Sequence, residues 1–563
     1  MEKRLLLAII LSVLVMYVYG ALVGKPAPKP AATVSQNAPG QNPAQTQSPT
    51  PGSVPDLTPL PTPGPTQVPA AAALVTEPNE REASIETGEV IAVFTNRGAL
   101  LKSLRLKHYL EPQTKQPQEI VERNVPNQPL PFSLQTPNEQ TSKTLNNALY
   151  AVTATSNDLR FEYRDTGGVR AVKQFHIDPS SYVITFTADV SDEGKTVTPT
   201  ILWGPAVGDA GEISRYTQAP EGLIDTGDKV QRLASKDLAK QSVYDGDFKF
   251  AGVDDNYFMT VALAPGPSKV SFQPIAIPPP AGSKDAGRAL VAYSIEPREN
   301  HPVKFFAGPK DFDVLSAIGP DMTRAINFGM FAVIVVPLLR SLKWVHGFIG
   351  NWGWSIVLLT VIINAIMFPL RHKSAVSMRK MQEIQPEVKA IQDRYAKFKA
   401  TDPQKQNMNK ELMELYKQRG VNPAAGCVPM LLTFPVLFAM WALLQTSIEL
   451  RGAPWFGWIH DLSSHDPYYV LPVLMGATSF WQQKMMPAAG GDPAQQKMMM
   501  FMPLFMMFIF LWLPAGALIY YVVTNIWTIG QQYLTNYLIG PPNVRSVRPP
   551  AERRLKRPAT NEQ

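Results

Sequence analysis

The sequence predicts a multi-domain membrane protein in which an α-helical polytopic bundle of six spans carries a β-sandwich on one side of the bilayer and an antiparallel helical hairpin on the other. Two observations predict this division. Apolar residues concentrate at the N-terminus and after about residue 325, whereas the stretch between them is polar and alternates with a period of two. The average composition, 45% hydrophobic residues with a mean hydropathy of -0.08, conceals this segregation.

The N-terminal region reads as an anchor followed by a tether. Residues 1–24 hold Lys3 and Arg4 ahead of a long apolar run without an A-x-A-like cleavage site, which favours an uncleaved membrane anchor whose start stays in the cytoplasm. Residues 25–81 contain fourteen prolines and few large apolar side chains. Such a composition cannot bury enough surface to fold, so a disordered linker is expected.

Residues 82–320 are expected to form the β-sandwich. In the stretch 181–190, Tyr182, Ile184 and Phe186 share one face of an extended chain, while Thr185 and Thr187 lie on the other. Similar short runs bounded by Gly, Pro, Asn or Asp succeed each other through this region, as in an antiparallel sandwich.

The chain returns to the membrane after residue 320. Residues 321–350 are apolar but contain Pro337 and several basic and aromatic residues at helical spacing, which favours an amphipathic helix in the interface. Further spans are expected over 352–370, 427–448 and 468–486, and two more within 497–537 on either side of a turn at Pro514.

Charge sets the expected topology. The loop 371–425 has twelve Lys and Arg against six Asp and Glu, and the tail 541–563 is also basic, so both would face the cytoplasm with the N-terminus. Within that loop, residues 375–420 are expected to form the two-helix hairpin. Its apolar seam repeats at spacings of three and four and comprises Met381, Ile384, Val388, Ile391, Tyr395, Phe398, Met408, Leu412 and Leu415.

Several classes of function lack their sequence signature. Cys427 is the single cysteine, and no HExxH spacing, Gly-rich phosphate loop or GxSxG motif is present, so no metal, cofactor or catalytic residue is expected. The net charge of +7 lies largely beside the spans, where it would meet anionic lipids; no specific nucleic-acid binding is expected.

Five long motifs resemble one known family. The stretches at 348–362, 378–395, 421–441, 449–476 and 510–532, among them "VNPAAGCVPMLLTFPVLFAMW" and "FLWLPAGALIYYVVTNIWTIGQQ", are similar to the core of the YidC-type membrane protein insertases, related to the mitochondrial Oxa proteins. The resemblance is dense over about 325–540, so that the insertase core of five spans would occupy 351–540. The anchor and the sandwich resemble the Gram-negative form.

This resemblance implies a location, a function and partners. The protein would lie in the bacterial inner membrane with both termini cytoplasmic and the sandwich periplasmic. It would insert newly synthesised membrane proteins and assist their folding, alone or with the Sec translocon, and it would not be an enzyme. The cytoplasmic loop and basic tail could bind the ribosome or targeting factors.

Polar residues within the spans are the candidate site. A hydrophilic substrate segment that crosses hydrocarbon leaves amides and hydroxyls unpaired at a cost of roughly 2 to 7 kcal/mol each, and a polar groove open to cytoplasm and lipid would lower that barrier. The alternative is that these residues only hydrogen-bond helix to helix. The candidates are Thr360, Asn364, Thr433, Gln445, Thr524 and Asn525.

One position departs from the family pattern. Where the family usually carries an arginine thought to attract acidic substrate segments, this chain has Asn364. Arg371 lies seven residues later, about 10.5 Å along a helix and on nearly the same stripe, and is a possible groove charge. Its side chain could lean back into the bundle, but snorkelling towards the cytoplasm is the favoured expectation.

Apolar substrate contacts are expected from adaptable and aromatic side chains. Methionines crowd the fourth and fifth spans, and unbranched thioethers adapt to varied apolar surfaces. By resemblance, aromatic residues join them. The candidates are Phe434, Trp441, Met485, Met502, Tyr520 and Tyr521.

Other functions remain open at this stage. A polytopic transporter would be expected to show acidic residues within its spans and inverted repeats, which the sequence lacks. A membrane-bound hydrolase could only use Ser463 near His460 and His465. An assembly chaperone acting only downstream of Sec would share the insertase motifs.

Overall fold

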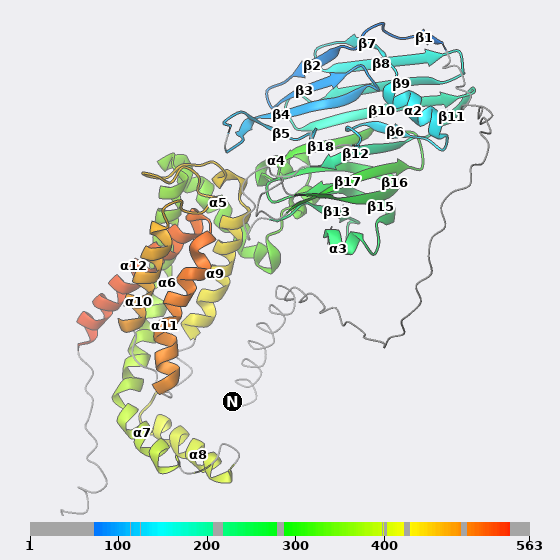
Figure 1. Cartoon of the computed structure of the whole chain (residues 1–563). Coiled ribbons are helices and arrows are strands. Elements are labelled where there is room, and N and C mark those ends of the chain that lie inside the picture. The colour runs from blue at the N-terminus through cyan, green and yellow to red at the C-terminus, as the bar shows by residue number, and fades with distance from the viewer. Residues whose placement is uncertain are drawn as a thin grey trace, which may run out of the picture. The chain divides into compact units, whose positions relative to one another are not determined.

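The computed structural model describes residues 72–540 except 113, 124, 126, 207–217, 279–286, 397, 399–401, 422–427 and 486–492 (Figure 1). The expected anchor, most of the expected linker, the basic tail and Cys427 lie outside the described residues. The described residues divide into a β-rich part and a helical part.

The β-rich part runs from the first strand to the short helices that precede the helical part. Its described elements are β1 (Ala73–Val75), β2 (Glu82–Glu86), β3 (Val90–Thr95), β4 (Leu100–Leu110), β5 (Pro117–Glu119), β6 (Ser133–Gln135), α2 (Glu139–Asn147), β7 (Ala151–Ala154), β8 (Asp158–Asp165), β9 (Arg170–Ile177), β10 (Val183–Asp192), β11 (Lys195–Val197), β12 (Thr200–Ala206), β13 (Glu221–Asp225), β14 (Val230–Leu233), α3 (Ser235–Leu238), β15 (Val243–Asp254), β16 (Phe258–Ile277), β17 (Arg288–Pro297), β18 (Val303–Pro309), α4 (Phe312–Ile318) and η1 (Pro320–Ala325).

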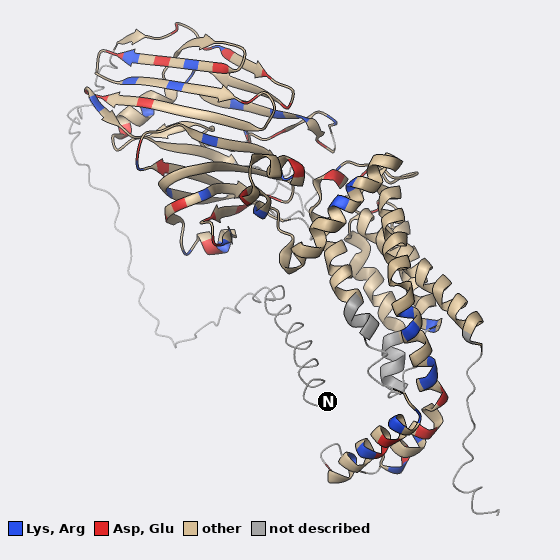
Figure 2. Ribbon diagram, turned by 180° about the vertical axis from the view of Figure 1, so that it is seen from behind, with Lys and Arg blue, Asp and Glu red and all other residues tan. Residues whose placement is uncertain are grey.

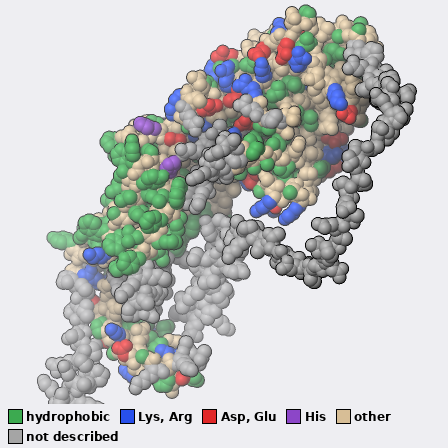
Figure 3. All heavy atoms as spheres, in the orientation of Figure 1, with side chains coloured by type: hydrophobic (Ala, Val, Ile, Leu, Met, Phe, Trp, Pro, Cys, Tyr) green, Lys and Arg blue, Asp and Glu red, His purple; other side chains and the backbone are tan. Residues whose placement is uncertain are grey.

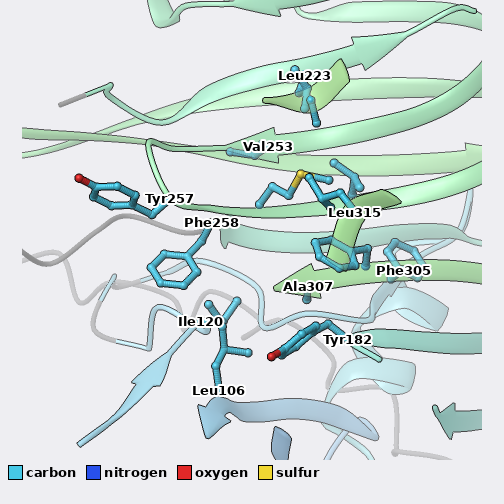
Figure 4. Close-up of a cluster of buried hydrophobic side chains, with 14 of the residues drawn as sticks. Leu106, Ile120, Tyr182, Leu223, Val253, Tyr257, Phe258, Phe305, Ala307 and Leu315 are labelled. Atoms are coloured by element: carbon cyan, nitrogen blue, oxygen red, sulfur yellow. The ribbon is translucent and has the colours of Figure 1, made fainter. Parts of the chain in front are cut away.

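Two antiparallel sheets pack face to face among the described strands. The larger has fourteen strands. Nine follow the path β1-β8-β9-β10-β18-β16-β15-β13-β14, and β6, β7, β11, β12 and β17 pair off this path. The smaller has the order β2-β3-β4-β5. Phe94 of the smaller sheet lies against Phe175 of the larger one, with ring centroids 4.6 Å apart. The period-two pattern of β10 buries Ile184 and Phe186 in this core, as expected from the sequence. Figure 4 shows part of this core, in which Leu315 of α4 lies among the buried side chains together with Phe305 and Ala307 of β18.

One buried cation holds together a corner of the sandwich. The ammonium group of Lys173 on β9 donates to the carbonyl oxygens of Gly98, Ala99 and Phe132 at 2.6, 3.4 and 2.8 Å. Ala99 and Phe132 both have positive φ. Burial lowers the pKa of Lys173. The lysine therefore pairs backbone carbonyls that the unusual chain path leaves without a strand partner.

The helical part comes next along the chain. Its described elements are η2 (Gly329–Phe331), α5 (Ala332–Ile349), α6 (Trp352–Glu383), α7 (Gln385–Arg394), α8 (Pro403–Gln418), α9 (Val428–Thr446), η4 (Ile448–Leu450), α10 (Val470–Met485), α11 (Pro493–Ile509), η5 (Phe510–Trp512) and α12 (Ala515–Ile539).

Local sequence explains where these helices begin and end. Gly350 closes α5 in the left-handed conformation, and the side chain of Asn351 accepts from the backbone N–H of Trp354 to cap α6. Gly353 permits a close contact, because a Cβ atom there would lie 2.1 Å from Cδ1 of Trp455. Pro514 starts α12 after the turn that the sequence predicts between the last two helices.

Helices α7 and α8 form a separate small hairpin with its own core. Ile384, Val388, Leu412 and Val421 are buried together, and Met381, Ile391, Met408 and Leu415 pack against them. Figure 2 shows charged residues gathered on this hairpin, whereas the helices of the bundle carry few. Seven of the nine residues of the predicted seam lie in or against this core, whereas Tyr395 and Phe398 lie outside it.

Two expected boundaries are wrong. The linker was expected to extend to residue 81, but Ala73 of β1 pairs with Asp165 of β8, so the sheet begins earlier. The hairpin was expected to start at residue 375, but α6 continues to Glu383 because no glycine or proline interrupts it after Pro369. Pro386 then lies in the first turn of α7, where its missing N–H is tolerated.

A carboxylate near the end of the sandwich makes folding stability depend on pH. Burial, and then the nearby Asp254, raise the pKa of Glu221 from 4.5 to about 7, although Arg232 lies 3.7 Å away. The folded state holds this proton more tightly than the unfolded state. The contribution to the free energy of unfolding is therefore complete below pH 4.5 and is lost as the pH rises to about 7.

We therefore expect Glu221→Gln to stabilise the sandwich at pH 8 by about 1 to 3 kcal/mol and to have little effect at pH 4.5. Denaturant unfolding of the full chain in an uncharged detergent, combined with hydrogen exchange of β13 and β15, measures this difference. Glu296→Gln, at an exposed position, is the matched control. Equal stability of Glu221→Gln and the wild type at pH 8 would contradict the prediction.

Candidate functional site

The helical part presents an apolar outer surface. Figure 3 shows hydrophobic side chains covering most of its visible face. Contiguous apolar surface of this kind is unfavourable in water and suits contact with lipid. Large exposed side chains on the helices include Val333, Trp344, Phe348, Ile366, Trp481, Phe505, Phe508, Tyr537 and Leu538.

Length and composition identify two candidate spans among the described helices. They cover Gly329–Ile349 and Trp352–Glu383, and shorter apolar helices lie at Thr433–Thr446 and Met500–Trp512. The first of these overlaps residues 321–350, for which the sequence favours an interfacial orientation. That orientation stays a prediction.

Two of the polar residues predicted for the site lie on α6, in the interior of the helical part. Thr360 and Asn364 are both buried. The hydroxyl of Thr360 donates to the carbonyl oxygen of Ile356 at 2.6 Å, and the amide of Asn364 donates to the carbonyl oxygen of Thr360 at 2.8 Å. Thr360 is thus satisfied within its own helix, whereas the side-chain oxygen of Asn364 is left to accept from another group.

Arg371 supplies that donor. Its Nη1 atom lies 2.8 Å from Oδ1 of Asn364 and 3.4 Å from the hydroxyl oxygen of Thr528 on α12. The expectation that this side chain snorkels away from the bundle is therefore wrong. Helical side chains lean towards the N-terminus, and here that lean carries the guanidinium group back along α6 to an amide acceptor inside the bundle.

Further polar contacts continue along the contact between α6 and α12. His372 lies 3.4 Å from the hydroxyl oxygen of Thr535, and Arg379 donates to the side-chain oxygen of Asn536 at 2.9 Å. We call the group formed by Asn364, Arg371 and Thr528 the α6–α12 polar cluster. Of these contacts, the cluster lies nearest to the N-terminus of α6.

The face of α12 beside this cluster carries buried polar atoms with no partner in the described part of the chain. They include Oγ1 of Thr524, Nε1 of Trp527 and Oε1 of Gln531. The hydroxyl of Thr528 donates to the carbonyl oxygen of Thr524 at 2.8 Å. A buried donor or acceptor without a partner costs roughly 1 to 3 kcal/mol. Water or a polar segment of another chain would remove that cost.

The other predicted polar residues are distributed more widely. Asn525 donates to the hydroxyl oxygens of Ser479 and Thr478 on α10 at 2.7 and 3.1 Å, so it joins α12 to α10. The carbonyl oxygen of Gln445 accepts from Asn256 of the sandwich at 3.3 Å. Thr433 is half-buried near the opposite end of α9 from Gln445.

The predicted apolar contact residues fall into a cluster and isolated positions. Phe510 lies between Trp441 and Tyr521, with ring centroids 6.1 and 5.6 Å away, and Tyr521 neighbours the buried Tyr520 at 5.7 Å. Phe434 and Met502 are exposed, and Met485 is half-buried. The structure thus brings Trp441, Tyr520 and Tyr521 together around Phe510.

Thr528, Trp527 and Gln531 were missing from the sequence-based site. Each lies three, four or seven residues after Thr524, so the helical period could have identified them once Thr524 was singled out. An indole ring at position 527 gives no signal of a polar site by itself, because such rings are common in apolar helices. Its N–H is visible as a polar group only when its burial is known.

The alternative chemistries find no support among the described residues. Ser463 donates its hydroxyl to Asp461 at 2.7 Å, which is not the nucleophile and base pairing that a hydrolase needs. No group of three or more His, Cys, Asp or Glu that could hold a metal ion occurs in the described ranges. The geometry of the site is that of a polar pairing surface within an apolar bundle.

Comparison with known proteins identifies the family. The family described as YidC periplasmic domain matches residues 82–341, and the family described as 60Kd inner membrane protein matches residues 344–540. A membrane protein insertase YidC from Pelobacter propionicus is 33% identical over 96% of this chain and 100% of its own length. One from Geobacter metallireducens is 34% identical over 95% of this chain and 98% of its own length. The chain belongs to the YidC family of membrane protein insertases.

Proposed function

We propose that the chain inserts newly synthesised proteins into the bacterial inner membrane by pairing their hydrophilic segments at the α6–α12 polar cluster. Its family membership makes it an insertase and not an enzyme. The observation that carries the proposed site is the position of Arg371, whose guanidinium group is held by Asn364 and Thr528 between helices with an apolar exterior.

The energetic reason for such a site is the cost of carrying polar groups through hydrocarbon. A charged side chain at the centre of a bilayer costs roughly 2.5 to 3.5 kcal/mol on insertion scales. A guanidinium group retains unused N–H donors after bonding Asn364 and Thr528, and a carboxylate accepts from it in a charge-assisted bond. Arg371 would thus attract acidic substrate tails. In the family, an arginine at the position of Asn364, two helical turns earlier, is thought to have this role.

The unpaired atoms on α12 support hydration of this face. Gln531 lies four residues after Trp527 and three after Thr528, so the three residues share one broad face of α12. Trp527 and Gln531 each keep a buried polar atom without a partner in the described ranges. Water along this face would satisfy both atoms and would solvate a crossing segment. The aromatic cluster of Trp441, Phe510 and Tyr521 offers an apolar surface for the following transmembrane segment.

The wider arrangement is proposed from charge and composition. Six spans, counting an N-terminal anchor at 1–24, would leave both termini and the α7–α8 hairpin in the cytoplasm and the sandwich in the periplasm. The hairpin and the basic tail are proposed to receive ribosomes or targeting factors and to meet anionic lipids. The Sec translocon is a proposed partner for longer substrates. Groove residues Thr433, Thr524 and Gln445 remain part of this proposal.

We expect Arg371→Gln to reduce the insertion of a substrate with an acidic tail by roughly five- to ten-fold, because the crossing carboxylates lose their charge-assisted partner. Insertion into membrane vesicles, scored by protease protection, is compared for an acidic tail and for the same tail with amides. Lys373→Gln, at an exposed position on the same helix, is the matched control.

Restoring the charge at the family position should restore function. The double variant Asn364→Arg with Arg371→Gln is expected to recover most of the acidic-tail insertion. If Arg371→Gln and Lys373→Gln insert both tails equally well, the guanidinium group has no part in insertion and the proposed site is wrong.

Hydration of the α12 face predicts a specific pattern of chemical labelling. In a Cys427→Ser background, Thr528→Cys should react with a membrane-impermeant maleimide, because thiolate formation needs water. Ile526→Cys, two residues away on an exposed apolar position, should react far more slowly. Labelling rates in proteoliposomes measure this difference. Equal rates at the two positions would mean that Thr528 does not face water.

A further inference from the structure

A second arginine of α6, Arg379, repeats the contact that Arg371 makes with α12. Arg371 lies 3.4 Å from the hydroxyl oxygen of Thr528, and Arg379 donates to the side-chain oxygen of Asn536 at 2.9 Å. In both pairs the two residues are 157 positions apart in the sequence. The two helices therefore run in the same direction along this contact, and the arginine contact recurs after eight residues on each of them.

The spacing of the two arginine contacts follows from this repeat. A helix rises about 1.5 Å per residue, so eight residues separate the contacts by about 12 Å along the helix axes. Eight residues are also little more than two turns, so both side chains lie on the side of α6 that meets α12. Arg371 and Arg379 are both half-buried there.

Both guanidinium groups keep donors that a further acceptor could use. Arg379 also donates to the carbonyl oxygen of Gly540 after the end of α12, and its Nε atom is buried without a partner in the described part of the chain. A guanidinium group presents five N–H donors, so these contacts leave some unused. No acidic residue precedes Glu383 on α6, and α12 contains none. Neither helix therefore offers a carboxylate between the two arginines.

A buried acceptor lies on α12 between the two contacts. Gln531 follows Thr528 by three residues and precedes Asn536 by five, is only 9% exposed, and keeps its Oε1 atom without a partner among the described residues. The phosphodiester of a lipid only accepts hydrogen bonds and cannot satisfy this oxygen, whereas the backbone N–H of a polypeptide can donate to it. Two cations with an acceptor between them therefore favour a peptide segment that carries carboxylates.

The distance between the contacts favours a particular spacing of acidic residues. An extended chain advances about 3.3 Å per residue, so carboxylates four positions apart lie about 13 Å apart and on one face of the segment. That distance matches the separation of about 12 Å between the arginine contacts. Adjacent carboxylates point to opposite faces of an extended chain, so only one of them can reach an arginine.

We propose that Arg379 is a second specificity-determining residue for insertion, which together with Arg371 selects extended hydrophilic segments whose acidic residues lie four positions apart. Arg379 is nearer to the α7–α8 hairpin, so it meets the leading carboxylate first. As the segment advances, that carboxylate passes to Arg371 and the following one binds Arg379. This inference rests on the proposed function, because it assigns a substrate class to the same face of the helical part.

The test is insertion into membrane vesicles, scored by protease protection, of one single-span protein with two tails of equal charge. One tail carries two adjacent aspartates, and the other carries them four positions apart. We expect the wild-type chain to insert the second tail about five-fold more efficiently. Arg379→Gln should reduce this ratio to about one, whereas Arg379→Lys, which keeps the charge, should retain most of it. Lys380→Gln, at the neighbouring exposed position, is the matched control.

The ratio of the two tails separates selection from a structural role. If Arg379 only caps the end of α12, Arg379→Gln lowers the insertion of both tails by the same factor and leaves their ratio unchanged, which would overturn the proposal. Equal insertion of the two tails by the wild type would also overturn it. In either case, if Arg371→Gln still impairs acidic tails, the proposed function stands and only the selection by spacing fails.

Disulfide crosslinking locates the segment without any substitution of Arg379. In a Cys427→Ser background, a cysteine between the two spaced aspartates should crosslink to Gln532→Cys, whose native side chain donates to Asn536 at 3.2 Å. It should not crosslink to Leu534→Cys, at an exposed apolar position. Equal yields at the two positions would place the segment elsewhere and overturn the proposal. A spacing preference that appears only in vesicles without anionic phospholipid would instead assign the arginines to lipid headgroups.

Discussion

The need to pair every buried polar group governs this structure, and it bears hardest on Arg371. In an apolar bundle, a guanidinium group without partners would cost several kilocalories per mole, so its position is decided by the acceptors within reach. Asn364 provides one acceptor on the same helix and Thr528 another on α12. Because Asn364 is itself held by the carbonyl oxygen of Thr360, the cluster fixes the arginine by contacts that extend over three turns of α6.

The same rule acts with a different outcome in the sandwich. Lys173 is buried as deeply as any core side chain, but the three carbonyl oxygens around it match the three donors of an ammonium group. That site is closed, whereas Arg371 keeps donors unused. The helix that supplies its partner Thr528, α12, also holds buried atoms of Trp527 and Gln531 that have no partner among the described residues. A satisfied cation stabilises a fold. A cation with spare donors, on helices that also carry unpaired polar groups, is suited to bind a hydrophilic substrate segment during insertion.

Much of the architecture could be predicted from the sequence because it depends on periodicity and composition. The alternation at 181–190 predicted a strand with Ile184 and Phe186 inside, and the seam of Val388 and Leu412 predicted the hairpin core. The site was harder to predict because it depends on which rotamer a long side chain adopts. The position of Arg371 in the sequence does not determine whether its side chain extends towards the cytoplasm or folds back along the helix to Asn364. Its other partner, Thr528, lies 157 residues away in the sequence. Asn525 likewise looked equivalent to its neighbours until its contact with α10 was known.

Reconstitution tests the central claim most directly. The purified chain alone is placed in liposomes, and a small single-span protein with a short acidic N-terminal tail is added, with insertion scored by protease protection. We predict protection well above that in empty liposomes, since Arg371 and the polar face of α12 would carry the tail although asparagine stands at the family's arginine position. No protection, together with crosslinking of a longer Sec-dependent substrate to residue 364, would contradict it and indicate a chaperone that receives helices only after Sec.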